Sequence, residues 1–170
     1  KAVGRRVLDK LWGNGVGIGA AMAMLPGARV IDCPRDPLEE CFSCFRTLFS
    51  DGHQEVTYAL ADMAAYWNDY ERACRHWHTL FPQSLRVQSY EALVAQPQEQ
   101  ITELLQFCDV PFDPACLHHS QTQRSVRTAS ASQVREPVMR ATALAAKSAA
   151  LLDPLRLALG SVAAPPGTTE

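Results

Sequence analysis

Arg35 and Ser43 are the residues whose types and spacing best suit the binding of an anion. A guanidinium presents a planar fork of donors that matches a phosphate, and a serine hydroxyl adds another donor. Asp36 and Pro37 between them are typical of the N-cap and first position of a helix, and Glu39 completes a capping box. Such a helix would offer free backbone N–H groups at its positive end. The pattern predicts a phosphate clamp.

A simpler interpretation of the same two residues stays open. An arginine beside acidic residues is often a surface side chain that pairs with one of them, here Asp36 or Glu39. Ser43 taken alone would be a small residue within a helix. Only the rest of the chain can favour the clamp over this alternative.

Alternating strand and helix patterns position these residues. An apolar, β-branched run places Arg35 just after a strand, and the following helix carries Ser43. Pro97 interrupts a later helix, and Pro114 opens a helical turn in a loop region. The sequence predicts an α/β domain over residues 1–159, with a parallel sheet flanked by helices and a disordered tail over 160–170. The expected helices are 15–25, 37–49, 53–80, 91–107 and 138–152, and the expected strands are 28–33 and 85–90.

The composition limits the classes of function. The chain has 170 residues, of which 47% are hydrophobic and 20% charged, which are values of a globular domain. The net charge of −2 gives no basic field for nucleic acid, so we expect no nucleic-acid partner. No apolar run or signal peptide predicts membrane contact, and six cysteines are no disulfide framework. We therefore expect a cytoplasmic protein without a membrane partner, and an inert pair at Cys41 and Cys44.

Six segments, taken together and in order, resemble the sulfotransferase family over about residues 5–140. The resemblance is greatest to bacterial sulfotransferase domains of the kind that often follow tetratricopeptide repeats, and more distant to protein-tyrosine sulfotransferases. Such repeats could therefore precede the domain in the full protein. The segments are Asp9-Lys10 with Asn14, Leu25 to Ile31, Arg35-Asp36-Pro37 with Ser43, Gln88 to Leu93, Phe107 to Pro114, and Val126 to Pro137.

The resemblance implies a P-loop-like fold and an enzymatic activity. The family transfers a sulfuryl group from 3′-phosphoadenosine 5′-phosphosulfate (PAPS) to a hydroxyl-bearing acceptor and releases 3′,5′-adenosine bisphosphate (PAP). The acceptor would be a peptide tyrosine, a glycan or a small metabolite. Lys10 matches the catalytic lysine near the transferring group, where it would neutralise developing charge. The implied cofactor-binding residues are Arg35 and Ser43 at the 3′-phosphate, Tyr90 near the nucleotide, and Arg127, Thr128 and Ser130 in a late segment that closes over it.

Family members also have a Gly-, Ser- and Thr-rich loop that holds the 5′-phosphosulfate, and the sequence before Lys10 contains none. The catalytic base usually comes from the same region. Lys1 stands where an initiator methionine would be. We therefore expect an N-terminally truncated piece of a longer protein that is not a competent enzyme by itself.

Two other classes of function remain as alternatives. Gly15-x-Gly17-x-x-Ala20, followed by Asp32 at the end of the next strand, fits the fingerprint of an NAD-binding oxidoreductase. Against it, the segment before the glycines is too charged for a central strand, and close helix packing also explains the glycines. The second alternative is a non-catalytic interaction module that uses aromatic residues of the 53–80 helix.

Overall fold

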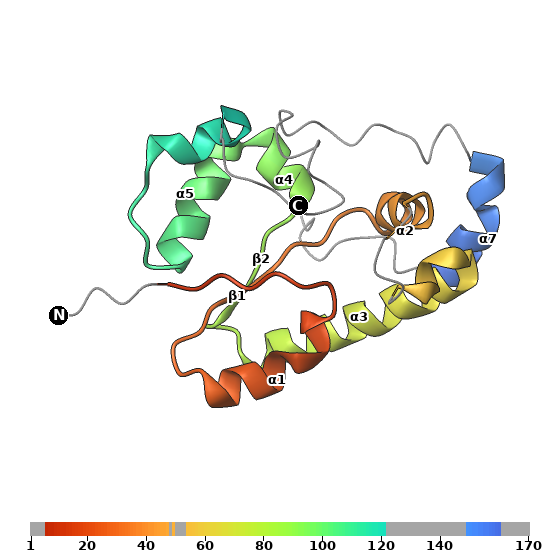
Figure 1. Cartoon of the computed structure of the whole chain (residues 1–170), viewed down its shortest axis with the longest axis horizontal. Helices are drawn as coiled ribbons and strands as arrows, with labels where there is room; N and C mark the ends of the chain where they lie inside the picture. The colour runs from red at the N-terminus through yellow and green to blue at the C-terminus, as the bar shows by residue number, and fades with distance from the viewer. Residues whose placement is uncertain (1–5, 48, 50–53, 122–148, 161–170) are drawn as a thin grey trace.

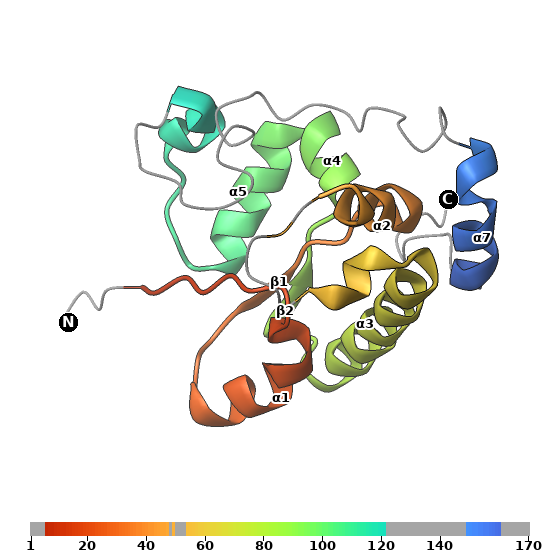
Figure 2. The same ribbon diagram turned by 45° about the vertical axis from the view of Figure 1, so that its right-hand side comes forward.

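Two short parallel strands form the sheet of this computed structural model, which describes residues 6–47, 49, 54–121 and 149–160. Strand β1 (Val30–Asp32) pairs with β2 (Leu85–Val87) in a register that sets Val30 opposite Leu85. Figures 1 and 2 show α1 and α3 on one side of the strands and α4 and α5 on the other. The described part is therefore a helix-rich α/β arrangement with a small parallel sheet, as expected.

Most of the described chain is helical. The chain between the strands contains α2 and α3, as in a parallel crossover connection. The helices are α1 (Asn14–Met24), α2 (Pro37–Phe45), the 3₁₀ helix η1 (Glu55–Tyr58), α3 (Leu60–Leu80), α4 (Tyr90–Ala95), α5 (Pro97–Phe107), the 3₁₀ segment η2 (Pro114–Gln121) and α7 (Ala149–Leu159). The break between α4 and α5 at Pro97 confirms the predicted interruption.

Several predicted boundaries differ from the structure. The helix expected over 37–49 ends at Phe45. The expected helix over 53–80 is divided at Ala59, whose extended backbone (φ −134°, ψ 134°) separates η1 from α3. Tyr90, expected at the end of the second strand, is instead the first residue of α4, because the Ser89 side chain caps that helix by accepting the N–H of Ala92 at 3.2 Å. The expected helix over 138–152 lies mostly outside the described residues, and α7 continues to Leu159.

The hydrophobic core lies among α2, α3 and α7. Each helix contributes residues that are at least nine-tenths buried, and Figures 1 and 2 both show α7 beside α3. The partly buried Trp12 and Leu38 extend the cluster. Because this core holds α2 in place, it also fixes the loop between β1 and α2 that carries Arg35. Its buried members are Cys41, Phe42, Met63, Ala64, Trp67, Leu152, Leu155 and Leu159.

The glycines of α1 allow that helix to approach α3 closely. A Cβ atom on Gly19 would lie 2.7 Å from Cη2 of the Trp77 ring. The Trp77 indole N–H also donates to the carbonyl of Gly15 at 2.8 Å, which fixes the ring against α1. A Cβ atom on Gly17, in contrast, would have nothing within 4 Å. Close packing of α1 on α3 therefore requires a glycine at position 19 but not at position 17.

This difference predicts that two alanine substitutions in α1 change the free energy of unfolding in opposite directions. Gly19→Ala should lower the free energy of unfolding by about 1–3 kcal/mol, because the new methyl group overpacks the contact with Trp77. Gly17→Ala should raise it by about 0.5–1 kcal/mol, since alanine loses less backbone entropy in a helix. Urea denaturation of both variants measures the difference. Equal effects of the two substitutions would contradict the packing argument.

Candidate functional site

Arg35 and Tyr90 meet where the two parallel strands end. Each residue lies three positions beyond the last residue of its strand. Two backbone hydrogen bonds hold these segments together, from Gln88 N–H to the Asp32 carbonyl at 2.7 Å and from Tyr90 N–H to the Pro34 carbonyl at 3.2 Å. The Arg35 guanidinium lies over the Tyr90 ring, 5.1 Å from its centroid. Two of the predicted cofactor-binding residues are thus joined at the carboxyl edge of the sheet, where α/β folds bind ligands.

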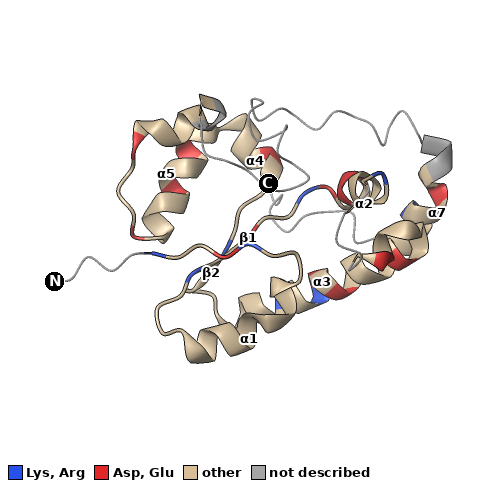
Figure 3. Ribbon diagram, viewed as in Figure 1, with Lys and Arg blue, Asp and Glu red and all other residues tan. Residues whose placement is uncertain are grey.

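The guanidinium of Arg35 has both a partner and an unused donor. Its Nη2 lies 3.7 Å from Oε2 of Glu39, one helical turn away, as the simpler interpretation of the sequence predicted. Its Nε is buried without a hydrogen-bond partner. Figure 3 shows the basic segment before α2 followed at once by acidic residues on that helix. Arg35 is therefore stacked and paired, yet retains a buried donor that a ligand could use.

Glu40 is a second acidic residue near this guanidinium. Burial raises the pKa of the Glu40 carboxyl, while the nearby Trp67 indole and the charge of Arg35 oppose that shift. Oε2 of Glu40 and Nε1 of Trp67 are nevertheless buried without hydrogen-bond partners, so the two groups lie near one another outside bonding geometry. Unsatisfied buried polar atoms are uncommon, and three of them gather around the strand end if Arg35 Nε is included.

The start of α2 offers fewer free backbone N–H groups than the sequence predicted. Asp36 caps the helix as expected, because its Oδ1 accepts the Glu39 N–H at 2.9 Å. The Glu40 N–H donates to the Asp36 carbonyl, and Pro37 has no N–H. The Asp36 N–H itself donates to Oε1 of Glu91 at 3.2 Å. An anion at this end would therefore depend on side chains more than on helix amides.

Two predicted site residues are not brought into contact with Arg35. Ser43 is exposed on α2, and in the described part of the chain no hydrogen bond involves its hydroxyl; its carbonyl accepts from Thr47. Lys10 is exposed in the extended segment before α1. Arg6 ties that segment to the end of α5 by donating to the carbonyls of Cys108 and Asp109, the latter at 3.0 Å. The roles of Lys10 and Ser43 remain predictions.

Three further predicted residues cannot be placed. Arg127, Thr128 and Ser130 lie outside the described residues. Their proposed closure over the cofactor therefore stays a prediction from the resemblance.

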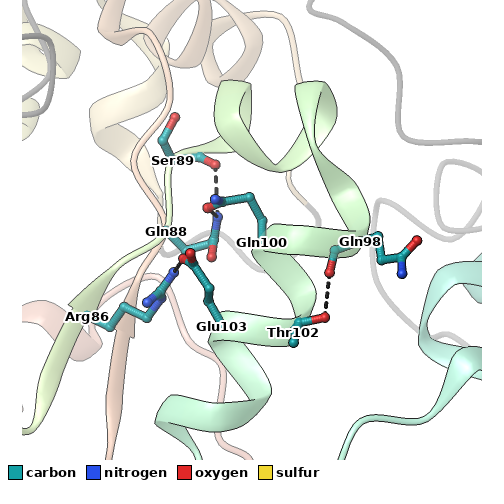
Figure 4. A network of polar contacts seen from close by, with 7 residues as sticks. All are labelled: Arg86, Gln88, Ser89, Gln98, Gln100, Thr102 and Glu103. Carbon is teal, nitrogen blue, oxygen red and sulfur yellow. Dashed lines mark hydrogen bonds and ion pairs between the residues drawn. The ribbon is translucent and has the colours of Figure 1, made fainter. Parts of the chain in front are cut away.

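A polar network that the sequence analysis did not predict supports the end of β2. The Gln88 side chain, only 3% exposed, donates from Nε2 to Oε1 of Gln100 at 3.0 Å, and Arg86 pairs with Glu103 at 2.7 Å. Figure 4 shows both contacts joining β2 to α5. In the sequence, a glutamine directly after an apolar strand was the available signal. This network fixes the strand end from which Tyr90 follows.

The structure argues against the NAD-binding alternative. The glycines of its proposed fingerprint lie within α1, not in a turn between a strand and a helix. Asp32, the proposed ribose contact, accepts a hydrogen bond from the hydroxyl of Tyr70 on α3. Burial and the charge of Asp32 raise the pKa of Tyr70. The α1 glycines and Asp32 therefore have a structural role, because they hold α1 and β1 on α3.

The interaction-module alternative also loses its main support. Trp67 is 7% exposed in the core, and Trp77 packs on α1. The aromatic residues of α3 thus serve their own domain. Among the described residues, no group of His, Cys, Asp and Glu side chains could hold a metal ion, and no helix is long and apolar enough to cross a membrane.

Comparison with known proteins identifies the family. The sequence model of the sulfotransferase family matches residues 1–114. A protein from Aquifex aeolicus (strain VF5), named only as an uncharacterized protein, is 34% identical over 139 residues. That match covers 81% of this chain and 18% of the relative, so the chain spans less than a fifth of its relative's length. With two-thirds of its residues inside the family match, the chain belongs to the sulfotransferase family.

Proposed function

We propose that this chain contributes the 3′-phosphate-binding part of a PAPS-dependent sulfotransferase domain. The observation that carries the proposal is the stacking of Arg35 on Tyr90 at the carboxyl edge of the sheet. When bound, PAPS would supply the activated sulfuryl group that passes to an acceptor hydroxyl. The acceptor in this proposal is a hydroxyl-bearing molecule such as a peptide tyrosine, a glycan or a small metabolite.

One feature above all suits these residues to the binding of a phosphate. The buried, unpartnered Nε of Arg35 is a donor that a phosphate oxygen would satisfy, and charge-assisted bonds of this kind are strong. Stacking on Tyr90 holds the guanidinium plane in a fixed orientation, which lowers the entropy lost on binding. Arg35 would therefore orient the nucleotide, and the Tyr90 ring would form part of the wall beside it.

The charges around Arg35 set a condition on this binding. Glu39 and Glu40 lie close to the guanidinium and would repel a phosphate dianion. We infer that additional cations must share the anion's charge. Lys10 and Arg127 are the ones that the family resemblance implies. Lys10 is exposed and so accessible to such a role, in which it would neutralise charge near the transferring group.

Removal of the Arg35 guanidinium is the decisive test. Arg35→Ala should weaken binding of PAP to the full chain by about 30-fold, or roughly 2 kcal/mol, as expected for a charge-assisted contact. Isothermal titration calorimetry measures this affinity. Arg46→Ala is the matched control, because Arg46 ends the same helix at its other terminus and should leave the affinity unchanged.

Two outcomes would overturn the proposal. PAP binding that is unaffected by Arg35→Ala would remove Arg35 from the site. Absence of PAP binding together with tight NAD binding would restore the oxidoreductase alternative, in which Gly15 to Ala20 would contact the dinucleotide.

A further inference from the structure

We propose that Glu91 is a positioning residue that holds Tyr90 against Arg35. Its effect on ligand affinity rests on the proposed function, but its effect on geometry does not. Glu91 is the second residue of α4, directly after Tyr90, and its side chain is exposed. It touches neither reacting group nor ligand in this proposal and acts only through its neighbours.

The Glu91 carboxylate bridges the starts of two helices. Its Oε1 accepts the backbone N–H of Asp36, the N-cap residue of α2, at 3.2 Å. Its Oε2 accepts the hydroxyl of Ser89, the N-cap residue of α4, at 2.9 Å. The two helices follow different strands, and Asp36 and Glu91 lie 55 residues apart in the chain. One side chain therefore ties together the segments that carry Arg35 and Tyr90.

The bridge lies next to the contact between the Arg35 guanidinium and the Tyr90 ring. Arg35 directly precedes Asp36, and Tyr90 lies between Ser89 and Glu91. Both residues of the stacked pair thus adjoin a group that the carboxylate binds. The backbone bond from Tyr90 N–H to the Pro34 carbonyl, also 3.2 Å long, links the same region. Without the bridge, the two segments would lose one of the hydrogen bonds that join them beyond the sheet, so we expect Arg35 and Tyr90 to be held together less tightly.

A simpler role for Glu91, an interaction with the helix dipole alone, predicts a different effect of its removal. An acidic residue in the first turn of any helix interacts favourably with the helix dipole. Glu99 occupies the first turn of α5, is also exposed, and has no hydrogen bond or ion pair among those described for the chain. Glu99→Ala therefore removes the dipole interaction alone, whereas Glu91→Ala removes the dipole interaction and the bridge.

The test uses the Arg35 Nε–Hε signal in a proton–nitrogen NMR spectrum of the full, ligand-free chain. The Tyr90 ring current shifts this signal, and Arg35→Lys assigns it by its loss. Tyr90→Leu gives the position of the signal without the ring. Glu91→Ala should move the signal most of the way towards the Tyr90→Leu position. Glu91→Gln, which keeps an oxygen acceptor for the Asp36 N–H, and Glu99→Ala should both leave it near the wild-type position.

Further variants and a second measurement complete the test. Glu91→Asp keeps the charge but is too short to span both partners, so it should shift the signal in the same direction even if Glu91→Ala does not fold. PAP affinity should fall about fivefold in Glu91→Ala and recover in Glu91→Gln. A wild-type Arg35 signal in both Glu91→Ala and Glu91→Asp would overturn the positioning role. Failure of every variant, and of the wild type, to bind PAP would overturn the proposed function while the NMR result still decides the positioning role.

Discussion

Leu155→Ala should lower the free energy of unfolding by about 2–5 kcal/mol. Leu155 lies on α7 with 0% of its surface exposed, in contact with the core that α2 and α3 form. Truncation to alanine removes buried methyl groups and leaves a cavity that the three helices can close only in part. The loss is a large share of the stability of a domain of this size, which is typically about 5–15 kcal/mol.

Leu157→Ala is the matched control for this prediction. Leu157 lies on the same helix but is 83% exposed, so the same change of residue should alter stability by less than about 0.5 kcal/mol. Urea denaturation, followed by tryptophan fluorescence to which the buried Trp67 contributes, measures both variants. Similar losses for the two leucines would mean that α7 does not pack on α2 and α3.

A loss of stability in Leu155→Ala would also show that the folded domain extends beyond the residues that match the family. The match covers residues 1–114, whereas α7 begins at Ala149. Phe42 and Cys41 of α2 pack in the cluster that Leu155 completes. Because α2 begins two residues after Arg35, a loosened α7 contact would reach the site through a single helix.

Local signals in the sequence predicted most of the described fold. Asp36 and Pro37 place the start of α2 correctly, and Pro97 separates α4 from α5, because caps and prolines act through their nearest neighbours. The break at Ala59 was not predicted, since the apolar spacing of the segment continues through it. The apolar pattern predicts a strand that continues to Tyr90, whereas the Ser89 cap begins a helix there.

The candidate site was predictable only in part for a similar reason. Arg35 and Tyr90 are brought together by parallel pairing, which the alternating strand and helix pattern implies. The contacts of Glu91 with Asp36 and of Gln88 with Gln100 join residues distant in sequence, and no local pattern encodes such partners. Fewer amides are free at the start of α2 than the sequence predicted, partly because the Glu91 carboxylate that accepts the Asp36 N–H comes from α4.

Buried thiols should make the protein lose stability as the pH rises above about 9. Burial, together with the charge of Glu40, raises the pKa of Cys41 from 9.0 to about 12, and burial with the charge of Asp32 does the same for Cys74. In the unfolded chain these thiols ionise near their ordinary pKa, whereas in the folded chain they stay protonated. A raised folded pKa means that the stability is fully present below pH 9.0 and is lost as the pH rises towards 12.

Denaturation under reducing conditions between about pH 8 and pH 10.5 checks this expectation. Each thiol should contribute a loss of about 1.4 kcal/mol per pH unit once the unfolded chain ionises, and Tyr70, whose pKa is also raised, adds to the loss at the upper end. Cys41→Ala and Cys74→Ala should each reduce the slope of stability against pH, although both also remove buried volume and lower stability at every pH. Cys116→Ala should keep the wild-type slope, because Cys116 is exposed. A stability that stays constant across this range would show that the two thiols ionise as readily in the folded chain as in the unfolded one, and would place them outside the core.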